Sequence, residues 1–334
     1  MTTIDSRLED LQAWLADQFG GASYTLAPAS ADASFRRYFR VTHGGATSVA
    51  MDAPPPQEDC RPFVRIAALL HAAGVHVPQI IAHDLDRGYL LLSDLGTKTY
   101  LDVINAENAD GLFREAIDAL IKWQLASRPD VLPPYDDALL RREMNLFPDW
   151  YVARHLKREL TAAQQQVLAN AMNLLANSVL AQPCVYVHRD YMPRNLMLST
   201  PNPGVLDFQD AVYGPITYDV ASLFRDAFLS WPEERVIDWS ARYWEKARAA
   251  GLPVRADFGE FWHDLEWMGL QRHLKVLGIF ARINYRDGKP HYLKDTPRFI
   301  AYVRAVANRY RPFGPLLKLF DELENVEVRA GYTF

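Results

Sequence analysis

The chain has 334 residues, 49% of them hydrophobic, which is enough for one large domain or for two lobes around a sizeable core. Its net charge of −5 and its isoelectric point near 6.0 argue against nucleic acid as a main partner. The two cysteines, Cys60 and Cys184, are too far apart in sequence to suggest a metal motif or a disulfide framework, which fits a reducing compartment.

The first 95 residues predict a small sheet crossed by a helix. Apolar residues from Ile4 to Phe19 recur at helical spacing, and two glycines then end that helix. Short runs bounded by turn residues predict strands at 23–26, 35–42, 47–51, 77–82 and 89–93, the last two paired as a hairpin. Residues 58–73 predict a second helix, which ends at Gly74.

After Gly96, long amphipathic patterns predominate, at 112–127, 135–146, 162–180 and in several stretches from 217 onward. This order predicts an α+β, bilobal, protein-kinase-like fold. A small β-rich lobe at 1–95 would bind the nucleotide, and a larger helical lobe at 96–334 would supply catalysis and acceptor binding, with ATP in the cleft. We place the join at 93–96, where the backbone of Ser93 and Leu95 can offer a carbonyl and an N–H to adenine. The alternative for this segment is an ordinary turn into a helix.

The clearest chemistry lies between residues 185 and 219. An apolar run at 185–187 leads into the loop His-Arg-Asp-Tyr-Met-Pro-Arg-Asn at 188–195, and short apolar runs at 196–198 and 205–206 then form a hairpin. Because a hairpin brings its ends together, Asp190, Asn195 and Asp207 are expected to converge. The spacing His-Arg-Asp-x-x-x-x-Asn is that of a kinase catalytic loop, whose aspartate takes the proton of the attacking hydroxyl. Asn195 and Asp207 would hold Mg²⁺ on the phosphates of ATP; the alternative is that these polar residues only cap a turn.

Three features depart from the protein-kinase pattern. The loop at 29–34 contains no glycine, although Ser30 and Ser34 could donate hydroxyls to phosphate. The third strand reads Val-Ala-Met-Asp, so Asp52 stands where a lysine is expected. Gln209 replaces the glycine that follows Asp-Phe, but the metal ligand needs only Asp207.

The small lobe must therefore present an arginine to phosphate, because no lysine precedes Lys98. We favour Arg36, which lies nearest the loop at 29–34. The other candidates are Arg37, Arg40, Arg61 and Arg65. Each of the five could instead be a solvated surface residue.

Several segments together carry a resemblance to a known family. They are 32–41, Met-Asp-Ala-Pro-Pro at 51–55, the loop at 188–195, Leu-Asp-Phe-Gln-Asp at 206–210, Gly-Pro at 214–215 with Tyr-Asp-Val-Ala at 218–221, and 271–280. Nearly the whole chain resembles the aminoglycoside phosphotransferase and choline kinase-like superfamily. Within it, the chain looks most like the anomeric sugar kinases of peptidoglycan recycling. Those enzymes use ATP to phosphorylate the C1 hydroxyl of N-acetylmuramate and N-acetylglucosamine.

The resemblance assigns roles to individual residues. It implies that Asp190 is the base, that Asn195 and Asp207 are metal ligands, and that the backbone of Ser93 and Leu95 contacts adenine. It further implies that Asp219 supports the catalytic-loop backbone. His188 would orient that loop without taking part in the chemistry.

The residues expected to bind the acceptor are charged and aromatic residues of the helical lobe. A muramyl sugar needs hydroxyl partners and a cation for its lactyl carboxylate; the candidates are Arg225, Arg272, His273, Lys275 and Glu143. Positive charge here would be odd in an aminoglycoside kinase, whose polycationic substrate calls for acidic residues. A choline kinase would use an aromatic and acidic cage, which Trp231, Trp262 and Trp267 could supply. Each of these groups could instead be a surface charge or a core aromatic.

The partners implied are ATP, Mg²⁺ and a small-molecule sugar, and no obligate protein partner is evident. The first residues are polar and acidic, without a signal-peptide core, and no apolar run is long enough to span a bilayer, so we expect a cytoplasmic protein with no membrane partner. Two rivals remain. One is a kinase of another small alcohol, such as an aminoglycoside or choline. The other is a nucleotide-binding pseudokinase, suggested by the missing lysine and glycines.

Overall fold

The computed structural model describes residues 5–30 and 35–325, without the side chain of Ser30. The chain forms two compact units, the first made of 1–123 and 193–210 and the second of 124–192 and 211–334. Residues 96–123 and 193–210 thus group with the N-terminal segment. The functional division into lobes at residue 95 stays a prediction.

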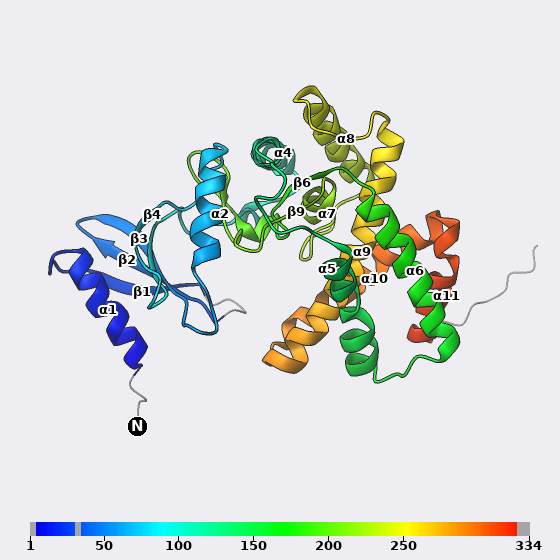
Figure 1. Cartoon of the computed structure of the whole chain (residues 1–334), viewed down its shortest axis with the longest axis horizontal. Helices are drawn as coiled ribbons and strands as arrows, with labels where there is room; N and C mark the ends of the chain where they lie inside the picture. The colour runs from blue at the N-terminus through cyan, green and yellow to red at the C-terminus, as the bar shows by residue number, and fades with distance from the viewer. Residues whose placement is uncertain (1–4, 31–34, 326–334) are drawn as a thin grey trace, which may run out of the picture. The chain divides into compact units, whose positions relative to one another are not determined.

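The first unit is built on a five-stranded antiparallel sheet in the order β1-β2-β3-β5-β4 (Figure 1). Its strands are β1 Thr25–Ser30, β2 Arg37–His43, β3 Ala46–Asp52, β4 Ile80–Asp84 and β5 Tyr89–Ser93. Helix α1, Ser6–Gln18, packs Leu11, Trp14 and Leu15 against one face of the sheet. Figure 1 shows α2, Arg61–Ala72, on the opposite side of the sheet from α1.

The segment 193–210 joins this unit as a short hairpin. It comprises η2 Pro193–Asn195, β7 Leu196–Met197 and β8 Gly204–Val205, and Leu196 pairs with Val205. Two backbone bonds attach it to the N-terminal segment: Val205 donates to the His76 carbonyl at 2.8 Å, and Leu198 donates to the Lys98 carbonyl at 2.8 Å. The predicted hairpin is confirmed. Two helices complete this part of the chain, α3 Tyr100–Val103 and α4 Ala109–Leu125, which ends just inside the second unit.

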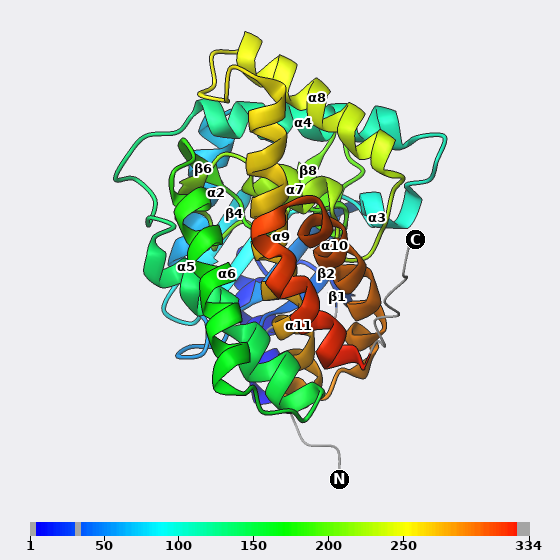
Figure 2. The ribbon, with the colours of Figure 1, turned by 90° about the vertical axis from the view of Figure 1, so that its right-hand side faces the viewer.

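The second unit is mainly helical. Its helices are α5 Asp137–Met144, η1 Phe147–His155, α6 Ala162–Leu180, α7 Tyr218–Phe224, α8 Glu233–Ala249, α9 Phe258–Asp287, η3 Pro290–Asp295, α10 Thr296–Arg309, η4 Arg311–Phe313 and α11 Gly314–Glu324. Strands β6 Cys184–Val187 and β9 Val212–Pro215 form an antiparallel pair. Helix α9 is central (Figure 2): every residue from Asp264 to Gly278 is buried, and it contacts α5, α6, α7, α8, α10 and η1.

The α+β fold predicted from the sequence is confirmed: a small antiparallel sheet comes first, and the remainder is mostly helical. The prediction missed α3, η1 and β9, and it began the first strand at residue 23 instead of Thr25. No helix in the described part of the chain is long and apolar enough to cross a membrane.

Candidate active site

The hairpin of the first unit brings Asn195 and Asp207 together. The Asn195 amide nitrogen donates to Asp207 Oδ2 at 3.3 Å, and Gln209 Nε2 donates to Asp207 Oδ1 at 2.8 Å. Phe208 is fully buried and packs on Phe63 of α2, with 4.7 Å between ring centroids, which holds the segment in place. Asp207 has a φ of 62°, a left-handed conformation that is uncommon for a non-glycine residue and clusters at functional sites.

The catalytic loop belongs to the second unit up to Met192. The buried Asp219 of α7 supports its backbone, because the two carboxylate oxygens accept the N–H groups of His188 at 2.7 Å and Arg189 at 3.0 Å. Burial raises the pKa of Asp219 to about 7, against the lowering effect of these two hydrogen bonds. The role that the resemblance implied for Asp219 is confirmed.

His188 orients the residue proposed as the base. Its Nδ1 accepts a hydrogen bond from the backbone N–H of Asp190 at 3.2 Å, so this nitrogen carries no proton and a neutral ring has its proton on Nε2. The side chain of His188 is buried, which fits a structural role. Because Asp190 lies in the second unit and the other two residues in the first, the predicted convergence of all three stays a prediction.

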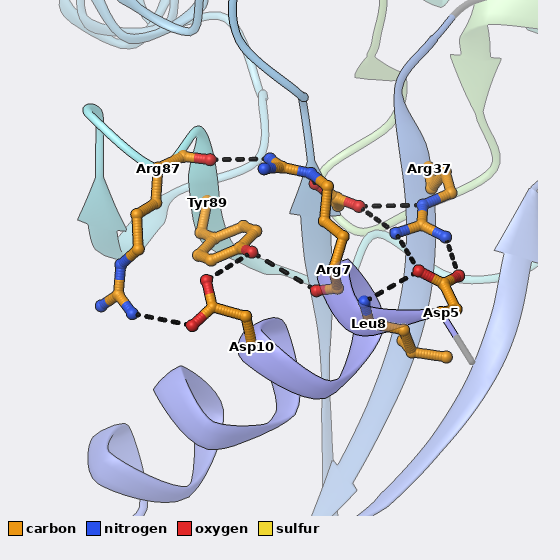
Figure 3. A network of polar contacts seen from close by, with 8 residues as sticks. Asp5, Arg7, Leu8, Asp10, Arg37, Arg87 and Tyr89 are labelled. Carbon is orange, nitrogen blue, oxygen red and sulfur yellow. Dashed lines mark hydrogen bonds and ion pairs between the residues drawn. The ribbon is translucent and has the colours of Figure 1, made fainter.

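The charge of the aspartate at the expected lysine position is compensated inside the first unit. Asp52 is fully buried at the end of β3; its Oδ1 accepts from Arg7 Nε at 2.7 Å and its Oδ2 from Arg37 Nε at 2.8 Å. Asp5, which caps α1, also binds Arg37 (Figure 3). Arg7 and Arg37 therefore serve to compensate a buried carboxylate and to attach α1 to the sheet.

Arg36 has a different environment. Its guanidinium pairs with Glu58 at 2.9 Å, and the two side chains are 13% and 16% exposed. Burial alone would lower the pKa of Arg36, but neighbouring acidic groups raise it, namely Tyr38, Glu58, Asp207 and Asp210. The guanidinium thus lies within electrostatic reach of the proposed metal ligand Asp207. This placement favours Arg36 over Arg37 as the arginine of the first unit that binds phosphate.

The predicted adenine segment ends β5. Ser93 donates its N–H to the Gln79 carbonyl at 2.8 Å, so this N–H is already used within the first unit. Of the two residues predicted to contact adenine, Leu95 is therefore the one expected to donate an N–H. Asp94 between them is held by Arg40 at 2.7 Å. The loop serines predicted to contact phosphate are not placed: Ser34 and the side chain of Ser30 lie outside the described residues.

Two of the predicted acceptor ligands pair with each other. Glu143 of α5 and Lys275 of α9 form an ion pair at 2.9 Å, and Lys275 also donates to the Tyr218 hydroxyl at 2.8 Å. Both side chains are less than one-tenth exposed. Glu143 accepts three further hydrogen bonds, from Arg189 of the catalytic loop, from the Tyr135 hydroxyl and, at 3.5 Å, from Gln271. These contacts favour a supporting role over direct contact with a sugar.

The other three predicted acceptor ligands differ in their hydrogen bonding. Arg272 is only 2% exposed, and its Nη1 has no hydrogen-bond partner among the described residues. Both ring nitrogens of the buried His273 likewise lack a partner in the described part of the chain. Burial and the charges of Arg272 and Arg225 lower the pKa of His273 well below its usual value, so the ring is neutral. Arg225 pairs with Glu233 at 3.3 Å and lies over the Tyr302 ring.

The tryptophans suggested as a cation cage do not gather in one place. Trp231 packs on Trp239 and under Arg235, Trp262 packs on Phe258, and Trp267 packs on Phe313 and Tyr310. Each ring thus belongs to its own cluster. This arrangement gives no support to a choline site built from these three residues.

Sequence reasoning missed three residues of the site: Glu58, Arg189 and Tyr135. No spacing rule joins Glu58 to Arg36, because strands β2 and β3 both lie between the two residues in the sequence. Arg189 offered a signal that could have been used. It stands between His188 and Asp190 in the catalytic loop, and an arginine that is partly buried there favours an acidic partner.

A small antiparallel sheet, a hairpin that carries the predicted metal ligands and a supported His-Arg-Asp loop are the features of a kinase-like phosphotransferase. A model of the "Phosphotransferase enzyme family" matches residues 25–258, and the chain belongs to that family. The resemblance stated from the sequence is confirmed at this level.

Relatives match over nearly the full length. The chain is 58% identical to an N-acetylmuramate/N-acetylglucosamine kinase of Pseudomonas putida, an alignment that covers 97% of this chain and 98% of that one. It is 50% identical to the N-acetylmuramate/N-acetylglucosamine kinase of Neisseria meningitidis, again over 97% and 98% of the two chains.

Solved structures with low sequence identity share the fold. A choline/ethanolamine kinase family protein of Mesorhizobium loti has a TM-score of 0.64 at 14% identity, over 94% of this chain and 98% of that one. The ADP-bound aminoglycoside phosphotransferase APH(2'')-Ib has a TM-score of 0.55 at 14% identity, over 88% and 97%.

Proposed function

We propose that the protein is an ATP-dependent kinase that phosphorylates the anomeric C1 hydroxyl of N-acetylmuramate, N-acetylglucosamine or both. The 58% identity over 97% of the chain to a kinase named for these two sugars is the observation that supports the choice of acceptor. The C1 position rests on the resemblance of the sequence to anomeric sugar kinases. The supported loop with Asp190 is consistent with the same reaction class. Since ATP is the donor, we propose the cytoplasm as the site of action.

In the proposed mechanism Asp190 accepts a hydrogen bond from the C1 hydroxyl and takes its proton. The C1 oxygen forms a bond to the γ-phosphorus while the bond from that phosphorus to the β–γ bridging oxygen breaks, and ADP leaves. Arg36 stabilises negative charge on the phosphates, and the backbone of Leu95 contacts adenine. These roles rest on the placement of each residue in its own unit.

The donor set at Asp207 fits Mg²⁺. Asp207 supplies a carboxylate and Asn195 an amide oxygen, and the buried Oε1 of Gln209 beside them has no hydrogen-bond partner among the described residues. Magnesium prefers such oxygen ligands and takes others from substrate phosphates and water. Bound there, Mg²⁺ would neutralise charge on the β- and γ-phosphates.

On the acceptor side we favour Arg272 for the lactyl carboxylate of N-acetylmuramate. Its buried guanidinium has an unfilled donor, whereas Arg225 already pairs with Glu233. His273, neutral and with both ring nitrogens unfilled by described residues, is the second proposed contact. Lys275 and Glu143 pair with each other, and we propose a positioning role for them.

A coupled ADP-release assay tests the function. The panel is N-acetylmuramate, N-acetylglucosamine, glucose, choline and kanamycin, with the methyl glycosides of the amino sugars as C1-blocked controls. Turnover with the free amino sugars only would support the proposal. Turnover with choline or kanamycin instead would point to another alcohol, and ATP binding without turnover on any acceptor would point to a pseudokinase.

The substitution Asp190→Asn tests the base. Because a general base contributes about 100- to 10,000-fold, we expect kcat to fall by that factor while the affinity for ATP stays nearly unchanged. Kinetics with saturating sugar, together with a nucleotide-binding titration, separate the two effects. Wild-type kcat in this variant would contradict the assignment of Asp190.

A further inference from the structure

We propose that Glu143 is a positioning residue that holds the catalytic loop through Arg189, and so fixes Asp190 for reaction. This inference rests on the proposed function, because it needs Asp190 to act on the acceptor. It specifies the positioning role proposed above for Glu143 by naming the loop residue through which this buried carboxylate acts.

Glu143 is the centre of a buried polar cluster in the second unit. Its Oε1 accepts from Arg189 Nη2 and from Lys275 Nζ, the latter at 2.9 Å, and its Oε2 accepts from the Tyr135 hydroxyl at 2.6 Å. Gln271 of α9 donates to the Tyr135 hydroxyl at 3.1 Å and fixes it in turn. One carboxylate thus connects α5, α9 and the catalytic loop.

The charges of the cluster extend to Asp190. Burial disfavours the ionised form of Glu143, but Lys275 and Arg189 outweigh it and lower its pKa to about 2, so the group is ionised at neutral pH. Burial also disfavours the charged forms of Arg189 and Lys275, yet the charges of Glu143 and Asp190 contribute to raising the pKa of each above its usual value. The cations Arg189 and Lys275 therefore interact with two carboxylates. These are Glu143 and the proposed base, Asp190. Removing Glu143 leaves an excess of buried positive charge beside Asp190.

Arg189 connects Glu143 to the backbone of the catalytic loop. Its φ is 76°, a left-handed conformation that is unfavourable in a non-glycine residue and persists only where the surroundings enforce it. Asp219 holds its backbone N–H, and Glu143 holds its side chain. Asp190 is the next residue, so its direction depends on this doubly held arginine.

The test compares two buried glutamates. Glu143→Gln keeps the side-chain size and removes the charge. The matched control is Glu266→Gln on α9, because Glu266 is 5% exposed and also binds an arginine and a tyrosine, Arg309 and Tyr310. Within the described part of the chain, Glu266 forms its hydrogen bonds and ion pair with Arg309 and Tyr310 and none with the catalytic loop. Both variants should lower the melting temperature.

Only Glu143→Gln should lower kcat, by about 10- to 100-fold, the size expected for a misplaced catalytic group. The KM for ATP should change less than twofold in both variants. Equal kcat losses in the two variants, or an unchanged kcat in Glu143→Gln, would overturn the inference. If the wild type turns over no acceptor, it is the proposed function that fails.

A second set of variants keeps the inference testable if Glu143→Gln folds poorly. It also tests whether Glu143 acts on the loop through Arg189. Glu143→Asp keeps the charge but shortens the reach, and we expect an intermediate loss of kcat. Arg189→Met should lower kcat, and adding Glu143→Gln to it should cost little more, because residues that act through one another are not additive. Fully additive losses would show that Glu143 does not act through Arg189.

Discussion

The assignment of Arg36 as the phosphate-binding cation leads to a quantitative prediction. Arg36→Met removes a guanidinium whose side chain is 13% exposed and which lies within electrostatic reach of Asp207. A hydrogen bond to a charged group contributes about 1.5–3 kcal/mol. Since 1.36 kcal/mol is a factor of ten, kcat/KM for ATP should fall by about 10- to 150-fold.

Steady-state kinetics with varied ATP and saturating sugar measure this loss. The matched control is Arg61→Met, which removes the same charge from α2 of the same unit; the Arg61 side chain is 61% exposed and pairs with the exposed Asp59 and Asp86. Exposed pairs of this kind contribute little, so we expect less than a twofold change. Glu58→Gln, which loosens the partner of Arg36, should give a smaller loss than Arg36→Met. Equal effects of Arg36→Met and Arg61→Met would refute the assignment.

Two further predictions concern stability. Gly278→Ala in α9 places a Cβ at 2.2–2.5 Å from the backbone and Cβ of Leu146, so it should lower the free energy of unfolding by about 1–3 kcal/mol or more. Gly269→Ala in the same helix meets its nearest atom at 3.6 Å and should be neutral or stabilising; equal melting temperatures for the two variants would contradict the packing. The lowered pKa of Glu143, about 2 against an ordinary 4.5, predicts a stabilisation of about 3 kcal/mol that is complete above pH 4.5 and is lost as the pH falls toward 2. Urea unfolding of wild type and Glu143→Gln should therefore differ at pH 7 and converge in acid, whereas a constant difference would show that Glu143 is not the titrating group.

The sequence was most informative where the chemistry is local. Asp190, Asn195 and Asp207 lie within 18 positions, and the hairpin that joins Asn195 to Asp207 could be read from apolar runs separated by turn residues. Asp219 was recognised only through the resemblance. The structure then showed its contacts with the loop backbone.

Pairings between distant residues could not be read from the sequence. Asp52 meets Arg7 and Arg37 at separations of 45 and 15 residues, and Gln271 reaches Glu143 across 128 residues. Such contacts depend on how elements pack, which no periodicity encodes. The ion pair between Lys275 and Glu143 in the second unit is one of these contacts. The sequence did not indicate it, and Lys275 was predicted to contact the acceptor.

Some elements were missed for local physical reasons. Residues 147–155 form a π-helix, whose wider hydrogen-bond spacing does not give the apolar period of an α-helix. Strand β9 has only four residues, and it includes Gly214 and Pro215, which are typical of turns. Its register is set by pairing with β6, from Cys184–Pro215 to Val187–Val212.

In the proposed reaction the C1 hydroxyl of an N-acetylated sugar attacks the γ-phosphate. The position of the phosphate in the product tests it most directly, by phosphorus–proton correlation NMR of the reaction of the wild type with N-acetylglucosamine and N-acetylmuramate. We expect the phosphorus to correlate with the anomeric proton at C1. A correlation with the protons at C6 instead would show that another hydroxyl is the acceptor and would contradict the proposed reaction at C1.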